Sequence, residues 1–178
     1  MTKDKSKWYM VTLVGKDQTS IVSHVTAALY DAGANLGETS MMRLGGNFTI
    51  MMMVEFSGSK KDLHDVLSSV TDSMDLHLHI DKIDAKLHEH KIPDVRISVY
   101  GADRIGIVSK VTSVLAEAGL NILDLESDVA GAVDKPLYVM HIEGEASEGV
   151  KPLESALQIV KDEDGIDIEL VEIDTMIG

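Results

Sequence analysis

The chain opens with apolar positions two residues apart, the period of a β-strand whose alternate side chains face a core. The same pattern returns near the middle of the chain. The positions predicted to face inward are Tyr9, Val11 and Leu13 in the first stretch and Val95, Ile97 and Val99 in the second. A glycine, Gly15 or Gly101, ends each stretch. The pattern therefore predicts two strands that begin two similar segments.

Intervals of three and four residues follow each glycine, and they predict a helix with one apolar face against a sheet. We expect Asp17 and Asp103 to cap these helices, because a carboxylate accepts hydrogen bonds from backbone N–H groups that lack partners. Gly33 and Gly119 stand where helices commonly end in a left-handed residue. The apolar positions are Ile21, Val22, Val25, Ala28, Leu29 and Ala32, then Ile107, Val108, Val111, Val114, Leu115 and Ala118.

Each segment continues with a hairpin, a second helix and a last strand. Two glycines, Gly45 and Gly46, precede Asn47 at the first hairpin turn and suit the positive φ that a tight turn needs. The first segment is expected to hold strands to residue 44 and over 48–56, a helix over 60–72 and a strand over 76–83. The second is expected to hold a longer connection over 130–136, a strand over 137–143, a helix over 150–163 and a strand over 167–173. The order βαββαβ predicts an α/β chain of the α+β kind, with a ferredoxin-like antiparallel sheet in each segment.

A direct repeat accounts for the similarity of the two segments. Residues 15–35 recur as residues 101–121 without a gap, and eleven of the 21 aligned positions are identical. Identity of this extent at a fixed offset indicates an internal duplication. We therefore expect two domains, residues 6–84 and 94–175, joined by a linker over residues 85–93.

Composition excludes several classes of function. Thirty acidic residues against 16 basic ones give a net charge of −14, whereas proteins that bind nucleic acid carry a basic face. The chain has no cysteine, and therefore no disulfide, thiolate metal site or cysteine nucleophile. No export signal and no apolar run of membrane-spanning length is recognisable. We expect a cytoplasmic protein that binds neither nucleic acid nor a membrane.

Two histidine pairs raise the question of a metal site, because imidazole is a common zinc ligand. His77 and His79 are two residues apart in a predicted strand, and His88 and His90 are two apart in the predicted linker. No further ligands at a suitable spacing accompany them, so we interpret them as surface residues and expect no metal and no cofactor. The chain also lacks a P-loop, a dinucleotide-binding fingerprint and a nucleophile elbow, and we do not expect an enzyme.

Methionines cluster on the two strands of the first hairpin. Packing in a core or interface is the favoured interpretation, because methionine fills irregular gaps. An adaptable surface that binds a partner is the alternative. The residues are Met41, Met42, Met51, Met52 and Met53.

The run from Gly101 to Val108 after a strand, with Ala118 to Ile122 closing the helix, resembles the ACT domain. The resemblance extends through both halves, and two such units without another domain are similar to the glycine cleavage system transcriptional repressor family. It implies regulation: ACT domains pair side by side and bind a small amino acid, such as glycine or serine, at the junction. The residues that match the binding positions are Asp17, Gln18, Ser20, Ile21, Asn35 and Leu36, and Asp103, Arg104, Gly106, Ile107, Asn121 and Ile122.

The chemistry of these residues suits a zwitterion. The start of a helix attracts a carboxylate, a glycine such as Gly106 lets a ligand approach the backbone, and the amide of Asn121 can both donate and accept. Each residue also has a structural interpretation as a cap or turn residue. Because the first copy has Ser20 where the second has Gly106, we expect Gly106→Val to weaken ligand binding more than Ser20→Val.

The function predicted from the sequence is that of a regulatory amino-acid sensor. It would control transcription or amino-acid metabolism through a protein partner, either a transcription factor or a metabolic enzyme. The alternative is a protein-interaction module that binds no ligand. Pairing within one chain and a homodimer are both left open, because exposed edge strands permit either.

Overall fold

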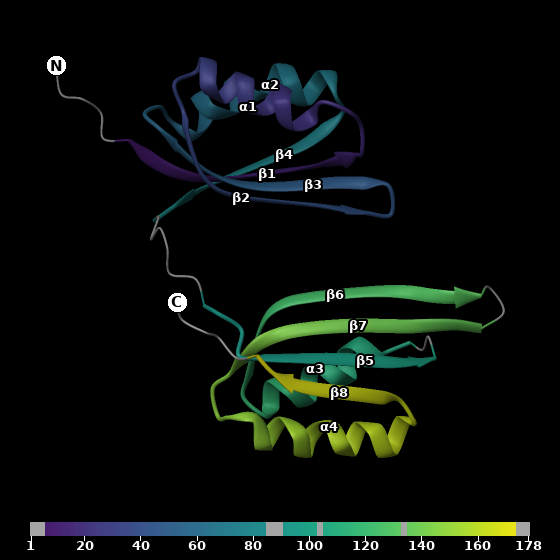
Figure 1. Ribbon diagram of the computed structural model, residues 1–178. Coiled ribbons are helices and arrows are strands. Elements are labelled where there is room, and N and C mark those ends of the chain that lie inside the picture. Colours follow the sequence, from purple (N-terminus) through teal and green to yellow (C-terminus); the bar gives the residue numbers. More distant parts are fainter. Residues whose placement is uncertain (1–5, 85–90, 103–104, 133–134, 174–178) are drawn as a thin grey trace. The chain divides into compact units, whose positions relative to one another are not determined.

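The computed structural model describes residues 6–84, 91–102, 105–132 and 135–173. The chain divides into two compact units, Met1–Glu89 and His90–Gly178. In each unit two helices cover one face of a four-stranded antiparallel sheet (Figure 1). The predicted α+β class and the βαββαβ order of each half are therefore confirmed.

The first unit has the strand order β2-β3-β1-β4. Its elements are β1 (Lys7–Lys16), α1 (Ile21–Asp31), β2 (Asn35–Leu44), β3 (Asn47–Phe56), α2 (Lys60–Ser73) and β4 (Leu76–Ile83). The second unit repeats this order as β6-β7-β5-β8. Its elements are β5 (Val95–Ala102), α3 (Ile107–Glu117), β6 (Leu120–Ala132), β7 (Lys135–Ala146), α4 (Val150–Asp164) and β8 (Asp167–Glu172).

Each unit has its own core between the sheet and the two helices. All six strand positions predicted to face inward are buried, and the helices contribute residues such as Val25, Leu29, Val111 and Leu115. Burying a side chain of this size stabilises the fold by roughly 1.5–3 kcal/mol. Val22 and Val108, which we expected on the buried face, are instead exposed at its border.

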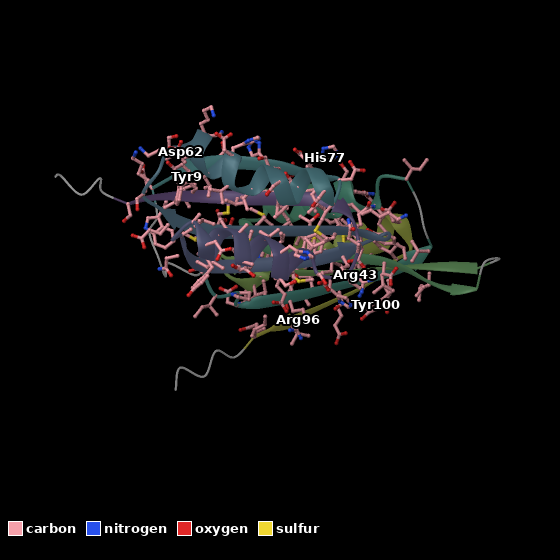
Figure 2. The ribbon with its side chains drawn as sticks, turned by 90° about the horizontal axis from the view of Figure 1, so that it is seen from above. Tyr9, Arg43, Asp62, His77, Arg96 and Tyr100 are labelled. Atoms are coloured by element: carbon pink, nitrogen blue, oxygen red, sulfur yellow. The ribbon has the colours of Figure 1, made fainter. Side chains whose placement is uncertain are left out.

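Hydrogen bonds in the first unit fix the start of α2 beside the sheet. Tyr9 Oη donates to the Gly58 carbonyl over 2.8 Å, at the end of the sheet where α2 begins. Ser59 and Asp62 form a reciprocal capping box at this helix start, which Figure 2 shows near Tyr9. The N–H and the hydroxyl of Ser59 both donate to the Asp62 carboxylate. The bond from the backbone N–H is the largest cause of the lowered pKa of Asp62.

The turn predictions hold in part. Gly45 and Gly46 adopt positive φ between β2 and β3, and Gly33 and Gly119 are left-handed after their helices, as predicted. The longer connection expected over 130–136 is wrong, because β6 and β7 pair as far as Ala132 and Lys135. The extra residues of the second copy lengthen a hairpin, since backbone groups are better satisfied in a ladder than in a loop.

Candidate functional site

The loop between the first strand and the first helix is the predicted binding position in each copy. The helix N-caps are Ser20 and Gly106, both left-handed, with φ of 71° and 91°, and neither of these two residues caps its helix through a side chain. The prediction that Asp17 caps α1 is therefore wrong. Its carboxylate pairs with Arg43 at 2.5 Å, and its N–H donates to the Gly46 carbonyl, so it ties this loop to the hairpin.

The uncapped helix start leaves donors for a ligand. The first N–H groups of a helix have no partner within the helix, and they carry a partial positive charge. In the second copy the Gly106 carbonyl accepts from the Lys110 N–H at 2.9 Å, so the helix is formed from its first turn. An L side chain at Gly106 would meet no heavy atom within 4 Å, which shows open space beside this turn.

A small cavity of about 120 Å³ lies at this helix start in the second unit. Lys110 is the positively charged residue that lines the cavity. Its ammonium contacts Asp164 at 2.5 Å and Glu163 at 2.8 Å. The hydrogen bond to Asp164 is the largest cause of a raised pKa at Lys110, so the ammonium is charged at neutral pH. The lining residues are Ile105, Gly106, Ile107, Lys110, Val160, Asp164 and Ile166.

The corresponding loop of the first copy is tied down. The Gln18 side-chain amide donates to the Met74 carbonyl over 2.7 Å, which joins the loop to the end of α2. Ile21 is only 2% exposed and belongs to the core. In the described conformation Ile21 has no surface to offer a ligand, whereas its counterpart Ile107 lines the cavity.

Asn35 and Asn121 lie at the other end of the first helix of each unit. Asn121 is the second residue of β6 and is paired with Glu145 of β7. The side chains of Asn121 and Lys91 both hydrogen-bond the Glu145 carboxylate. The hydrogen bond from Lys91 is the largest cause of the lowered pKa of Glu145. Asn35 is exposed in a groove of about 510 Å³ that also includes Leu36 and Tyr30.

Within one unit these two sets of predicted residues are not brought together. The eleven residues of α1 or α3 separate them, a distance of about 16 Å along a helix. A ligand that touches both sets therefore requires two units. Asp103 and Arg104 lie outside the described residues.

Sequence reasoning missed the far wall of the cavity, Val160, Asp164 and Ile166. Val160 and Asp164 belong to the last turns of α4 and Ile166 follows it, and only tertiary packing brings them to α3. The change from His24 to Lys110 between the copies was the available signal, because it places a cation beside one helix start and not the other.

Metal ligation finds no support in the part of the chain that the structure describes, where no three histidine or acidic side chains converge. His79 instead contacts Asp81 through Nε2 at 2.8 Å, and His88 and His90 lie outside the described residues. Among the helices of the described residues, none has the length and apolar character needed to cross a membrane.

Two successive βαββαβ units, each with a helix that starts uncapped after a left-handed residue, define a tandem small-domain protein. The chain belongs to the ACT domain family, whose model matches residues 8–81 and 94–171. It is a tandem ACT protein.

Relatives agree with this assignment. The glycine cleavage system transcriptional repressor of Escherichia coli is 23% identical over 144 residues, which cover 80% of this chain and 76% of the repressor. The UPF0237 protein YjhC of Lactococcus lactis is 36% identical over 72 residues, covering 40% of this chain and 83% of that protein. The crystal structure of an unknown protein from Galdieria sulphuraria has a TM-score of 0.76 at 26% identity, covering 96% of this chain and all of that one.

Proposed function

We propose that this protein is a regulatory sensor that binds a small amino acid at the start of α3. The observation that carries the proposal is the cavity of about 120 Å³ that brings the start of α3, whose N-cap Gly106 has no side chain to cap it, beside the Lys110–Asp164 ion pair. A zwitterionic amino acid offers one group of each sign. Its carboxylate would meet the helix start and Lys110, and its ammonium would meet Asp164.

The size of the cavity favours a small ligand. Its apolar wall, formed by Ile105, Val160 and Ile166, offers no hydrogen bond to a polar side chain. Glycine and alanine are therefore better candidates than large or charged amino acids, and serine fits the size of the cavity but would find no partner for its hydroxyl on this wall. Asn35 and Asn121, which are also matched through the family, follow the far ends of α1 and α3, so the proposed site is the cavity at the start of α3.

Ligand binding regulates only if it has different affinities for two states of the protein. We propose that the output passes through a protein partner, a transcription factor or a metabolic enzyme. The E. coli relative is named as a transcriptional repressor, and the net charge of −14 argues against direct contact of this chain with DNA.

Thermal unfolding in the presence of each of the twenty amino acids tests the proposal. A ligand that binds the native state raises its stability by RT ln(1 + [L]/Kd), or about 2.7 kcal/mol at a hundredfold excess over Kd. We expect saturable stabilisation by one or two small amino acids. Lys110→Met, which keeps the length of the side chain and removes its charge, is expected to abolish the response, while His24→Met in the first copy leaves it intact.

A uniform absence of stabilisation would refute the sensor and leave the interaction module as the function. Equal loss of the response in Lys110→Met and His24→Met would instead place the ligand somewhere other than the α3 cavity. Isothermal titration with the stabilising amino acid gives the number of sites per chain, and one site is expected.

A further inference from the structure

The sheet of each unit has a second face, opposite its helices, and the two copies differ sharply there. In the first unit the residues of β1 and β3 that alternate with the core positions point to this outer face, and so do Ser40, Met42 and Leu44 of β2. Most of them are apolar. We call this surface the methionine face, and it consists of Trp8, Met10, Val14, Met42, Met51 and Met53.

The matched outer face of the second unit is charged. Arg96 occupies the position of Met10, and Glu143, its cross-strand partner, occupies the position of Met53. Arg96 Nη2 and Glu143 Oε1 form an ion pair at 2.6 Å. The same surface carries four further ionisable residues, Asp124, Glu126, His141 and Glu169.

The difference between the two outer faces shows which features the fold itself requires. Both sheets have the same strand order and the same pattern of buried positions, and one of them is stable with an ionic outer face. An antiparallel sheet commonly has one solvated face. An apolar outer face is therefore not needed to form this domain, and its retention in the first unit indicates a surface that becomes covered.

The methionine face is open within its unit. Met42 is 58% exposed, Met51 46% and Val14 39%. Contiguous exposed apolar side chains of this kind mark interaction sites, and methionine adapts its shape to an opposing surface.

The charge of the molecule restricts what can cover this face. The outward residues at the centre of the sheet, Met10, Thr12, Val14, Met51 and Met53, carry no charge. The ionisable groups beside this centre stand at its border. They are Glu55 at the end of β3, opposite Trp8, and His77, His79 and Asp81 on the edge strand β4. In a chain with a net charge of −14, two copies repel each other through most of their surfaces. A neutral centre opposed to an identical neutral centre avoids that repulsion.

The area also suits self-association. Four strands about 4.8 Å apart, each with about eight residues at 3.3 Å, give the whole outer face of this sheet, which is the methionine face together with its border, an area of roughly 500 Å². Two such faces bury about 1,000 Å², which is the lower limit for a specific interface. We propose that the methionine face packs on the methionine face of a second copy of this chain, sheet against sheet, in a two-fold symmetric dimer.

The mass in solution tests the proposal directly. Sedimentation equilibrium of the full chain is expected to give twice the monomer mass of 19.3 kDa at high concentration, with dissociation on dilution. Because the contact is apolar and salt screens the repulsion between acidic chains, the dimer is expected to persist or tighten in 1 M NaCl. A monomeric chain at about 100 µM, or a dimer that high salt dissolves, would overturn the proposal.

Matched variants locate the interface. Met51→Glu places a carboxylate at the centre of the face twice per dimer and is expected to weaken dimerisation at least ~100-fold. Val14→Glu is expected to act in the same direction. Val171→Glu, an equally exposed valine on the outer face of β8, is the control and should leave the mass unchanged.

Circular dichroism establishes that each variant is folded, which the exposure of Met51 in the monomer favours. An unchanged dimer in both Met51→Glu and Val14→Glu, or equal loss in Val171→Glu, would contradict the proposed interface. The proposal goes beyond ligand sensing: Met51→Glu monomers are expected to keep the thermal response to amino acids, so the two ideas fail separately.

Discussion

Replacement of Gly106 by valine probes both the fold and the proposed site. Gly106 has φ of 91°, in the region that L residues avoid, and it directly precedes α3. Its counterpart Ser20 has φ of 71° and already pays this conformational cost in the first copy. Valine can therefore be introduced at both positions, where the backbone conformation is similar but the original residue is serine in one copy and glycine in the other.

The cost can be worked out from the surroundings. A Cβ built at Gly106 has no heavy atom within 4 Å apart from its chain neighbours, so the expected loss of stability comes from the backbone and not from overlap. A left-handed L residue costs roughly 1–2 kcal/mol, and a β-branched residue is at the upper end. Loss of glycine freedom in the unfolded chain returns about 0.4–1 kcal/mol. We expect Gly106→Val to destabilise its unit by about 1 kcal/mol, and Ser20→Val by less.

Urea unfolding of both variants beside the wild type measures this difference in the free energy of unfolding. In thermal unfolding, a loss of 1 kcal/mol lowers the Tm of a domain of this size by about 4–8 °C. The thermal response to amino acids is the second readout. It should fall more in Gly106→Val, because Gly106 lines the cavity and an added side chain hinders the close approach of a ligand to the backbone there. Equal losses of stability in the two variants, or none in Gly106→Val, would refute the argument from φ.

Three further predictions concern positions away from the cavity. Gly144→Ala should lower stability by ~1–3 kcal/mol in urea unfolding, because its Cβ would lie 2.6 Å from the Asn121 carbonyl oxygen; a neutral result contradicts this. Ser59→Ala should cost about 1 kcal/mol at pH 7 in urea unfolding, and the part due to the hydroxyl bond to the Asp62 carboxylate should be lost as pH falls through the lowered pKa of Asp62. Gln18→Ala should increase hydrogen exchange of the β1–α1 loop, and unchanged exchange would exclude the proposed tie.

Much of the fold followed from local signals. Alternation located β1 and β5, because a half-buried strand must place every second side chain in the core. Glycine pairs located the hairpin turn, since positive φ is costly for other residues. The duplicated run over residues 15–35 and 101–121 then extended each inference from one copy to the other.

Predictions that depended on competition between partners were less successful. Asp17 is of a residue type that commonly caps helices. In the folded chain, however, its carboxylate pairs with Arg43, on a strand distant in sequence. The helix instead begins after Ser20, whose own side chain does not cap it. A cap assignment from sequence cannot include a cation that only folding brings near.

The sequence by itself determined two ACT domains, their element order and the positions at which a ligand is expected, because these depend on periodicity and on a repeat within the chain. Tertiary structure alone decided which helix start borders a cavity, since Lys110 and Asp164 meet only when α3 packs beside α4. It also decided that one sheet leaves an apolar face open and the other an ionic one. Strand register, which a single strand does not encode, places those side chains on a common surface.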